Sequence, residues 1–263
     1  MKIVYDMPSE EYFAIHALSA SGAKLLNRSA AHYLADKATP RSPSPAMAFG
    51  SLVHTLILEP QTVDARYAAM PKINKRTNAG KEEAAEFEQA NANKIIVDLD
   101  DFQRGQRTAA AVLAHPTARD LLNADGQSEA TVLWEQHGVD CKARLDYLSG
   151  DCILDIKTAR DASYDGFSRA CSTYSYHMQA AHYMAASEAM GKQRPFLFIV
   201  VEAQPPFNVA VYTLTAADLA AGREQMKRAA EVFKDLGNDK RWTGYPLGIT
   251  PLALRWNGGS NEE

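Results

Sequence analysis

The order of the predicted elements favours a single α/β domain with a central mixed β-sheet flanked by helices. Helical patterns fill the first half of the chain, a run of alternating strands follows, and a helix, two strands and a last helix complete it. The chain has 263 residues, of which 46% are hydrophobic, which is enough to bury one sizeable core. We expect this domain to span residues 1–256 and a polar, disordered tail to occupy residues 257–263.

Composition excludes several classes of protein. The three cysteines, Cys141, Cys152 and Cys171, are odd in number and lack C-x-x-C spacing, so neither a disulfide framework nor a zinc site is indicated. No apolar run reaches the roughly 18 residues that a membrane span needs, and no signal-peptide pattern is present. We therefore expect a cytoplasmic protein that does not enter a membrane.

The elements can be placed by their periodicity and their breaks. We predict helices over 19–36, with Ser19 or Ser21 as cap, and over 46–58 after a proline-rich loop at 39–45. A basic, turn-rich loop at 70–81 precedes an acidic helical run at 82–88. Later elements are two helices over 100–122 that break at His115-Pro116, a strand at 130–135, a largely helical stretch over 164–190, strands at 196–202 and 208–214, and a helix over 216–236.

The central hairpin, V-D-C-K-A-R-L-D-Y-L-S-G-D-C-I-L-D-I-K-T, runs from residue 139 to 158 and turns at Ser149-Gly150. Side chains in a strand alternate between faces. Asp155 and Lys157 therefore share one face of the second strand, and Asp146 can join them from the first. The opposite faces hold Cys141, Ala143, Leu145 and Tyr147 on the first strand, and Cys152, Leu154 and Ile156 on the second.

Two carboxylates beside an ammonium form a patch suited to phosphoryl chemistry. Mg2+ takes oxygen ligands and commonly uses one or two carboxylates together with substrate phosphates. A neighbouring lysine can orient a water molecule or offset developing charge. The alternative is a solvated strand face with a surface Asp–Lys pair, and D-x-K alone does not decide between the two.

The surrounding sequence resembles the PD-(D/E)XK nuclease superfamily, with Asp155 in the D/E position and Lys157 as its lysine. The segment from Gly50 to His54 is similar to the G-x-x-x-H motif of RecB-like nucleases, and the segment from Gln179 to Tyr183 to their Q-x-x-x-Y motif. The stretches S-A-S-G-A-K-L-L-N-R-S-A-A-H-Y, R-T-N-A-G-K and C-K-A-R-L-D resemble RecE-type (exonuclease VIII-like) prophage nucleases. The resemblance extends from Tyr5 to Leu236.

This resemblance implies a site. His54, Asp146 and Asp155 would hold Mg2+, with Mn2+ able to substitute and two ions per site expected, while Lys157 would position the attacking water. A lone histidine on an apolar helix is more often a core residue, and only the whole set favours a ligand for His54. Further candidates are Glu129, a carboxylate before a strand or else a surface acid, and Gln179, which could fix the lysine or touch DNA.

The resemblance also implies an activity: digestion of linear duplex DNA from the 5′ end, release of mononucleotides, and a 3′ single strand for a RecT-like annealing protein. Relatives form rings of three or four subunits, so we expect a trimer or tetramer. The net charge of −4 counts against a DNA partner, but local basic stretches can supply phosphate contacts. The candidate DNA-binding residues are Lys24, Arg28, Lys75, Arg76, Lys81, Arg144, Gln179 and Tyr183.

Other functions stay open at this point. The same residues would serve a related nuclease of other polarity or an endonuclease, since metal chemistry cleaves any accessible phosphodiester. A DNA-binding module with a decayed site is a further alternative, although the full His-Asp-Asp-Lys set argues against decay. The basic loop at 72–81 is either a solvated loop or an arm that becomes ordered on DNA.

Overall fold

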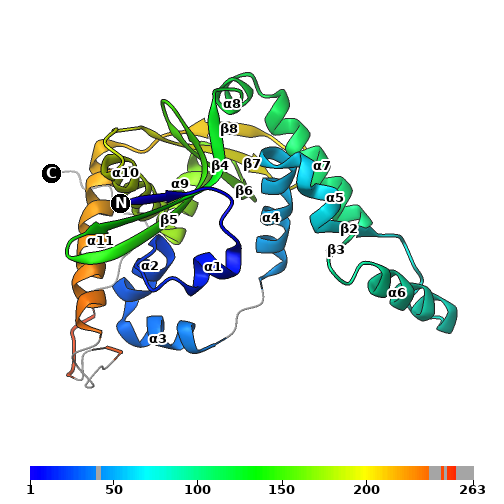
Figure 1. Ribbon diagram of the computed structural model, residues 1–263, viewed down its shortest axis with the longest axis horizontal. Helices are drawn as coiled ribbons and strands as arrows, with labels where there is room; N and C mark the ends of the chain where they lie inside the picture. The colour runs from blue at the N-terminus through cyan, green and yellow to red at the C-terminus, as the bar shows by residue number, and fades with distance from the viewer. Residues whose placement is uncertain (40–42, 237–243, 246–247, 253–263) are drawn as a thin grey trace.

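The computed structural model describes residues 1–39, 43–236, 244–245 and 248–252. Its centre is a six-stranded sheet in the order β1-β4-β5-β6-β7-β8, in which β6 and β7 run parallel and every other neighbouring pair is antiparallel (Figure 1). This confirms the predicted α/β fold with a mixed sheet. The strands are β1 (Lys2–Val4), β4 (Gly126–Gln136), β5 (Val139–Ser149), β6 (Ile153–Ala159), β7 (Phe196–Glu202) and β8 (Val209–Tyr212).

Strand β7 shows how the sheet is covered on both faces. Phe196, Phe198 and Val200 belong to one hydrophobic cluster, while Ile199 and Val201, which alternate with them, belong to the other. A strand buried on both faces is expected to be apolar along its whole length, as F-L-F-I-V-V is. The first cluster is covered by α2 (Ala20–Arg28), α9 (Tyr164–Tyr174), α10 (Tyr176–Ala189) and α11 (Ala216–Asp235). The second is covered by α4 (Pro45–Leu58), α7 (Leu99–Ala114) and α8 (Pro116–Leu122).

The expected single helix over 19–36 is wrong, because the chain forms two helices there. After the short α1 (Ser9–Ala14) come α2 (Ala20–Arg28) and α3 (Ala30–Ala38), separated by Ser29 in an extended conformation. The hydroxyl of Ser29 accepts the backbone N–H of His32 and so caps α3. Ser19 caps α2 in the same way, as predicted. Part of the proline-rich loop, residues 40–42, lies outside the described residues.

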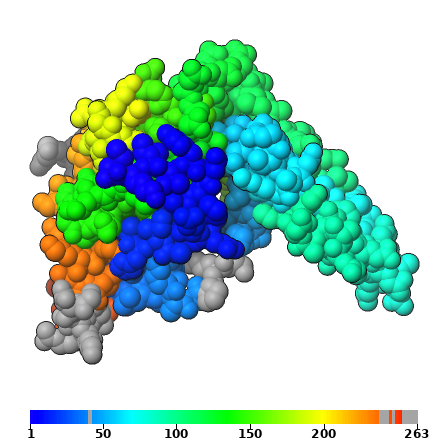
Figure 2. All heavy atoms as spheres, viewed as in Figure 1, coloured from blue at the N-terminus to red at the C-terminus, as the bar shows by residue number. Residues whose placement is uncertain are grey.

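A small projecting unit was predicted only in part, since the sequence indicated its helical run at 82–88 but neither of its strands. It comprises η1 (Pro60–Thr62), α5 (Val63–Arg66), β2 (Tyr67–Met70), α6 (Asn78–Ala90) and β3 (Ile95–Asp98), with β2 and β3 paired in parallel. Helix α6 extends away from the body as an arm (Figures 1 and 2). The helix also begins earlier than the predicted residue 82, because the hydroxyl of Thr77 accepts the N–H of Gly80 and caps it.

The remaining predicted elements are present with shifted ends. Helix α7 ends before His115 and Pro116 opens α8, as expected from the proline. The helical stretch over 164–190 divides at Ser175, which has a left-handed conformation with φ 56° and ψ 43°. The expected tail at 257–263 lies outside the described residues. None of the helices that the structure describes is both long and apolar enough to cross a bilayer.

The contact between α10 and α11 gives a test of the packing. A Cβ built on Gly222 would lie 2.3 Å from the carbonyl oxygen of His177, whereas one on Gly150 meets nothing within 4 Å. Gly222→Ala gains about 1 kcal/mol of helix propensity, but forcing the two helices apart costs roughly 1–3 kcal/mol, which leaves a net loss of up to about 2 kcal/mol. We expect urea unfolding to show Gly222→Ala destabilised and Gly150→Ala within about 0.5 kcal/mol of wild type. Equal stabilities would contradict this packing.

Candidate metal centre

The site begins at an irregularity in β4. Glu129 lies inside this strand with φ 51°, a left-handed conformation that is rare for a residue other than glycine. Ser128 pairs with Tyr147 and Ala130 with Leu145, but no pair joins Glu129 to Asp146, which lies opposite. Backbone distortion of this kind is concentrated at functional sites.

The irregularity changes the face of the sheet on which the side chains of the neighbouring strand β5 lie. Cys141, Ala143 and Leu145 lie in the first cluster as predicted, but Tyr147 packs against the second. The expectation that all four share one face is therefore wrong for Tyr147, because the alternation of β5 breaks at Asp146. On β6 the prediction is confirmed, with Cys152, Leu154 and Ile156 together in the second cluster.

Where β5 and β6 separate, side chains take the place of the backbone hydrogen bonds between the two strands. The two strands pair only at Tyr147–Leu154 and Leu148–Ile153. Beyond that point the backbone N–H of Ile156 donates to Asp146 Oδ2 at 2.9 Å, and its carbonyl oxygen lies 2.6 Å from His54 Nε2. Both backbone groups of Ile156 are thus satisfied by side chains of the candidate site.

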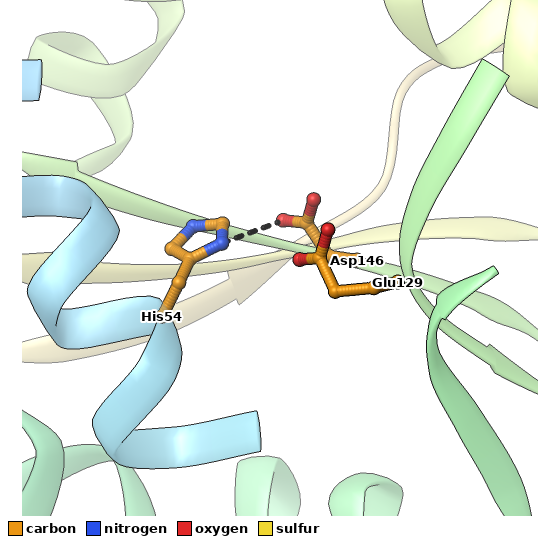
Figure 3. Close-up of side chains that lie close together, drawn as sticks. All are labelled: His54, Glu129 and Asp146. Carbon is orange, nitrogen blue, oxygen red and sulfur yellow. Dashed lines mark ion pairs between the residues drawn. The ribbon is translucent and has the colours of Figure 1, made fainter. Parts of the chain in front are cut away.

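His54 reaches this position from α4. A Cβ on Gly50 would lie 3.4 Å from Thr158 Oγ1, so the helix lies close against β6 one turn before the histidine. A proton on Nε2 is required for the bond to the Ile156 carbonyl, and in the neutral ring this leaves the Nδ1 lone pair free. Nδ1 lies 3.5 Å from Asp146 Oδ2 (Figure 3).

His54, Glu129 and Asp146 form a possible metal-binding group. Each offers a ligand atom, and these atoms lie within 4.8 Å of one another (Figure 3). Burial and the neighbouring Asp146 charge raise the pKa of Glu129 to about 7. An imidazole with two close carboxylates is a donor set that fits Mg2+ or Mn2+, and a cation there would relieve the repulsion between the carboxylates.

Asp155, the third expected ligand, is not part of that group. Its side chain is fully buried and is held by two neighbours: Gln179 Nε2 donates to Oδ1 at 2.7 Å, and Lys157 forms an ion pair with Oδ2. Burial raises the pKa of Asp155 and the lysine opposes that effect. Two roles were predicted for Gln179: fixing the lysine or contacting DNA. The geometry fits the first role, because Gln179 holds Asp155, the ion-pair partner of Lys157.

Lys157 is also covered by an aromatic ring that sequence reasoning missed. Its Nζ lies 4.9 Å from the ring centroid of Tyr176, a cation–π contact. Tyr176, Gln179 and Tyr183 follow each other at i, i+3 and i+7 on α10, so helical spacing from the Q-x-x-x-Y motif could have indicated it. Tyr183 itself is partly buried and packs against the first cluster.

Arg144 lies beside the candidate site and contacts protein groups. Its guanidinium donates to Met7 O and Ser9 Oγ, both at 3.0 Å, and lies over the ring of Tyr12. Arg144 Nε is 3.8 Å from Glu129 Oε2. Arg144 was predicted as a DNA-binding residue, and in the structure its guanidinium is engaged by these protein groups, among them the Glu129 carboxylate. The N-terminal segment that surrounds this arginine carries no motif that would have indicated it.

The other candidate DNA-binding residues lie in different settings. Lys24 donates to the carbonyl of Tyr174 at 3.2 Å. In the loop between β2 and α6, Lys75 pairs with Glu88 at 3.7 Å, so this cation already has a carboxylate partner. Among the residues that the structure describes, no ion pair is recorded for the exposed cations Arg28, Arg76 and Lys81.

Comparisons with known proteins agree with this fold. The sequence profile of the PDDEXK-like domain of unknown function (DUF3799) matches residues 19–247. A crystal structure from Eubacterium rectale, provisionally named an exonuclease, aligns with a TM-score of 0.61 at 16% identity, over 95% of this chain and 97% of that one. The structure of SSO0001 covers 79% and 84% at 17% identity, but its TM-score of 0.31 is too low to support an argument. No curated protein matches the chain.

The raised pKa of Glu129 predicts a pH-dependent stability without metal. Between its ordinary pKa of 4.5 and about 7 the folded protein binds more protons than the unfolded chain, so stability falls as pH rises through this window. Glu129→Gln removes the charge and should stabilise the metal-free protein at pH 8 by about 1–3 kcal/mol, with no gain near pH 4.

Thermal melts in chelator across this pH range measure the effect. Glu135→Gln, an exposed carboxylate on the same strand, is the matched control and should show no such trend. Adding Mn2+ should raise the melting temperature of wild type more than that of Glu129→Gln. A Glu129→Gln protein that is no more stable at pH 8 than wild type would contradict the buried-charge interpretation.

Proposed function

The chain belongs to the PDDEXK-like family, and from this premise we propose that it is a metal-dependent DNA nuclease, specifically an exonuclease of RecE type. The observation that carries the proposal is the position of an imidazole and two carboxylates beside a buried Asp–Lys pair. The name of the Eubacterium rectale neighbour is consistent with it. The alternative, a solvated surface pair of Asp155 and Lys157, does not fit, because Asp155 is fully buried.

The metal-binding residues and Lys157 would have separate roles. His54, Glu129 and Asp146 would hold Mg2+, or Mn2+ in its place, with Asp155 next to them. A bound divalent cation polarises a phosphoryl oxygen and lowers the pKa of its water. Lys157 is kept as an ammonium by Asp155 and held by Tyr176, so it can donate hydrogen bonds to the attacking water or to the phosphoryl oxygen.

The finer parts of the proposal rest on the sequence motifs. RecE-type resemblance supports digestion of linear duplex DNA from the 5′ end, release of mononucleotides, and a 3′ single strand for a RecT-like annealing protein. It also supports two ions per site, a ring of three or four subunits, and a place in the cytoplasm. The alternatives are other polarity or endonuclease activity. A decayed module fits less well, because every member of the His-Asp-Asp-Lys set is present.

The chemistry is tested by removing its parts. Asp146→Asn and Lys157→Ala should each lower the rate of DNA cleavage by about a hundredfold or more, because the groups act as a unit. Asp151→Asn is the control, since this carboxylate lies on the same hairpin with its side chain 98% exposed. Release of end label from linear duplex, with Mg2+ and with chelator, is the measurement. Cleavage at the wild-type rate by Lys157→Ala would refute the assignment.

The requirement for an end and the ring are tested together. A ring that threads one DNA end should not cut closed circles, and should digest long stretches without exchanging onto a competitor DNA. We expect a trimer or tetramer by light scattering, digestion of linear DNA, and intact closed circles. Rapid nicking of circles would favour an endonuclease. A monomer that digests processively in the presence of competitor would refute the ring as the cause.

A further inference from the structure

A large cleft opens beside Lys157. Its volume is about 960 Å3, and it lies between the start of α4, strand β6, helix α9 and the first turns of α7. Lys157 lines it, and the ion-pair partner of Lys157 is the buried Asp155. The cleft is therefore placed to hold whatever is presented to that lysine.

The charges that line this cleft are mostly positive. Arg104, Lys157, Arg160 and Arg169 line it, against two carboxylates. Asp101 pairs with Arg104 at 2.8 Å, and Asp161 lies 3.9 Å from Arg169. Arg160 is exposed, and no carboxylate partner is recorded for it within the described part of the chain. Lys157 is paired with Asp155, so the four cations and their three carboxylate partners leave one net positive charge in the cleft of a chain whose net charge is −4.

An aromatic pair forms the rim. Tyr174 and Tyr176 stand on either side of Ser175, the left-handed residue between α9 and α10, with ring centroids 5.6 Å apart. Both rings line the large cleft and also a second one of about 310 Å3, so they stand on the boundary between the two. Tyr176 covers Lys157, whereas Tyr174 is 55% exposed.

The exposed ring has a charged neighbour as well. Lys24 Nζ lies 5.4 Å from the centroid of Tyr174 and donates to its carbonyl oxygen. The two clefts that share Tyr174 therefore bring together an ammonium, an exposed ring and, in the larger cleft, Arg160 and Lys157. Basic grooves interleaved with aromatic rings bind single-stranded nucleic acid, because phosphates meet the cations and bases stack on the rings.

We infer that this cleft holds the DNA strand that is being cut, in single-stranded form, with its phosphates on Arg160 and Arg169 and a base stacked on Tyr174. A base inside an intact duplex is already stacked on both faces, so the ring selects an unpaired base. The inference rests on the proposed nuclease function and deepens it: the duplex end must open before a phosphate reaches Lys157.

The test is binding of a short single-stranded oligonucleotide in chelator, where cleavage is absent. 2-Aminopurine near the 5′ end reports stacking through loss of fluorescence, and anisotropy gives the affinity. Tyr174→Leu should abolish the loss of fluorescence and weaken binding by roughly tenfold, the effect of one stacked base. Tyr174→Phe keeps the ring and should behave as wild type. Arg160→Ala should weaken binding and make the salt slope shallower by roughly 0.7.

Tyr164→Leu is the matched control, since this tyrosine lies on the same helix α9, is 74% exposed, and does not line the cleft. It should change neither signal. Unchanged fluorescence and affinity in Tyr174→Leu, with a wild-type melting curve, would overturn the inference. So would equal losses in Tyr164→Leu, or tighter binding of blunt duplex than of single strand by wild type.

Failure of the nuclease proposal gives a different result. Hydrolysis of bis(p-nitrophenyl) phosphate by the wild-type protein with Mn2+ needs no strand path, so it reports the metal chemistry alone. No hydrolysis of either this diester or DNA would refute the proposed function, and the binding of single strands would then be judged by itself. Hydrolysis without any stacking signal would refute only the strand path.

Discussion

The candidate site depends on the way the backbone of Ile156 is satisfied. Where β5 and β6 separate, its N–H and its carbonyl lose their ladder partners, and Asp146 and His54 take their places. A buried backbone group without a partner costs roughly 1–3 kcal/mol. Two of the three residues that would bind a metal, His54 and Asp146, therefore also replace the missing backbone partners, so the site geometry and the local fold have the same cause.

The two carboxylates brought together at this separation of β5 and β6 repel each other, and neighbouring positive charge offsets this repulsion only in part. Glu129 and Asp146 lie close enough for the second charge to help raise the pKa of the first, and Arg144 only partly opposes this. A folded protein of higher stability would have an amide at one of these positions. Retaining both carboxylates stores repulsion that a cation would release, which is the trade between stability and function expected of a binding site.

Sequence patterns predicted the hairpin, the shared face of Asp155 and Lys157, and the order of helices, because each of these follows from local periodicity. They did not predict the left-handed Glu129 or the altered face of Tyr147. Glu129 lies where His54 of α4 and the N-terminal segment meet the sheet, and no short window of sequence contains that contact. The altered face of Tyr147 accompanies the same irregularity. The parallel pair β2–β3 was missed for the same reason: its strands are four residues each and are separated by a whole helix.

The break at Ser29 is different, because its signal is local. A serine followed by a second apolar stripe is an ordinary cap, yet continuous helical periodicity on both sides concealed it. The surroundings of Lys157 follow partly from local sequence and partly from contacts with a distant helix. Its neighbour Asp155 was predictable from a two-residue spacing, whereas Tyr176 and Gln179 come from a helix that the fold brings over β6. An ammonium held by a carboxylate and an aromatic ring loses little entropy when a phosphate arrives, so its position in the basic cleft is already set before substrate binds.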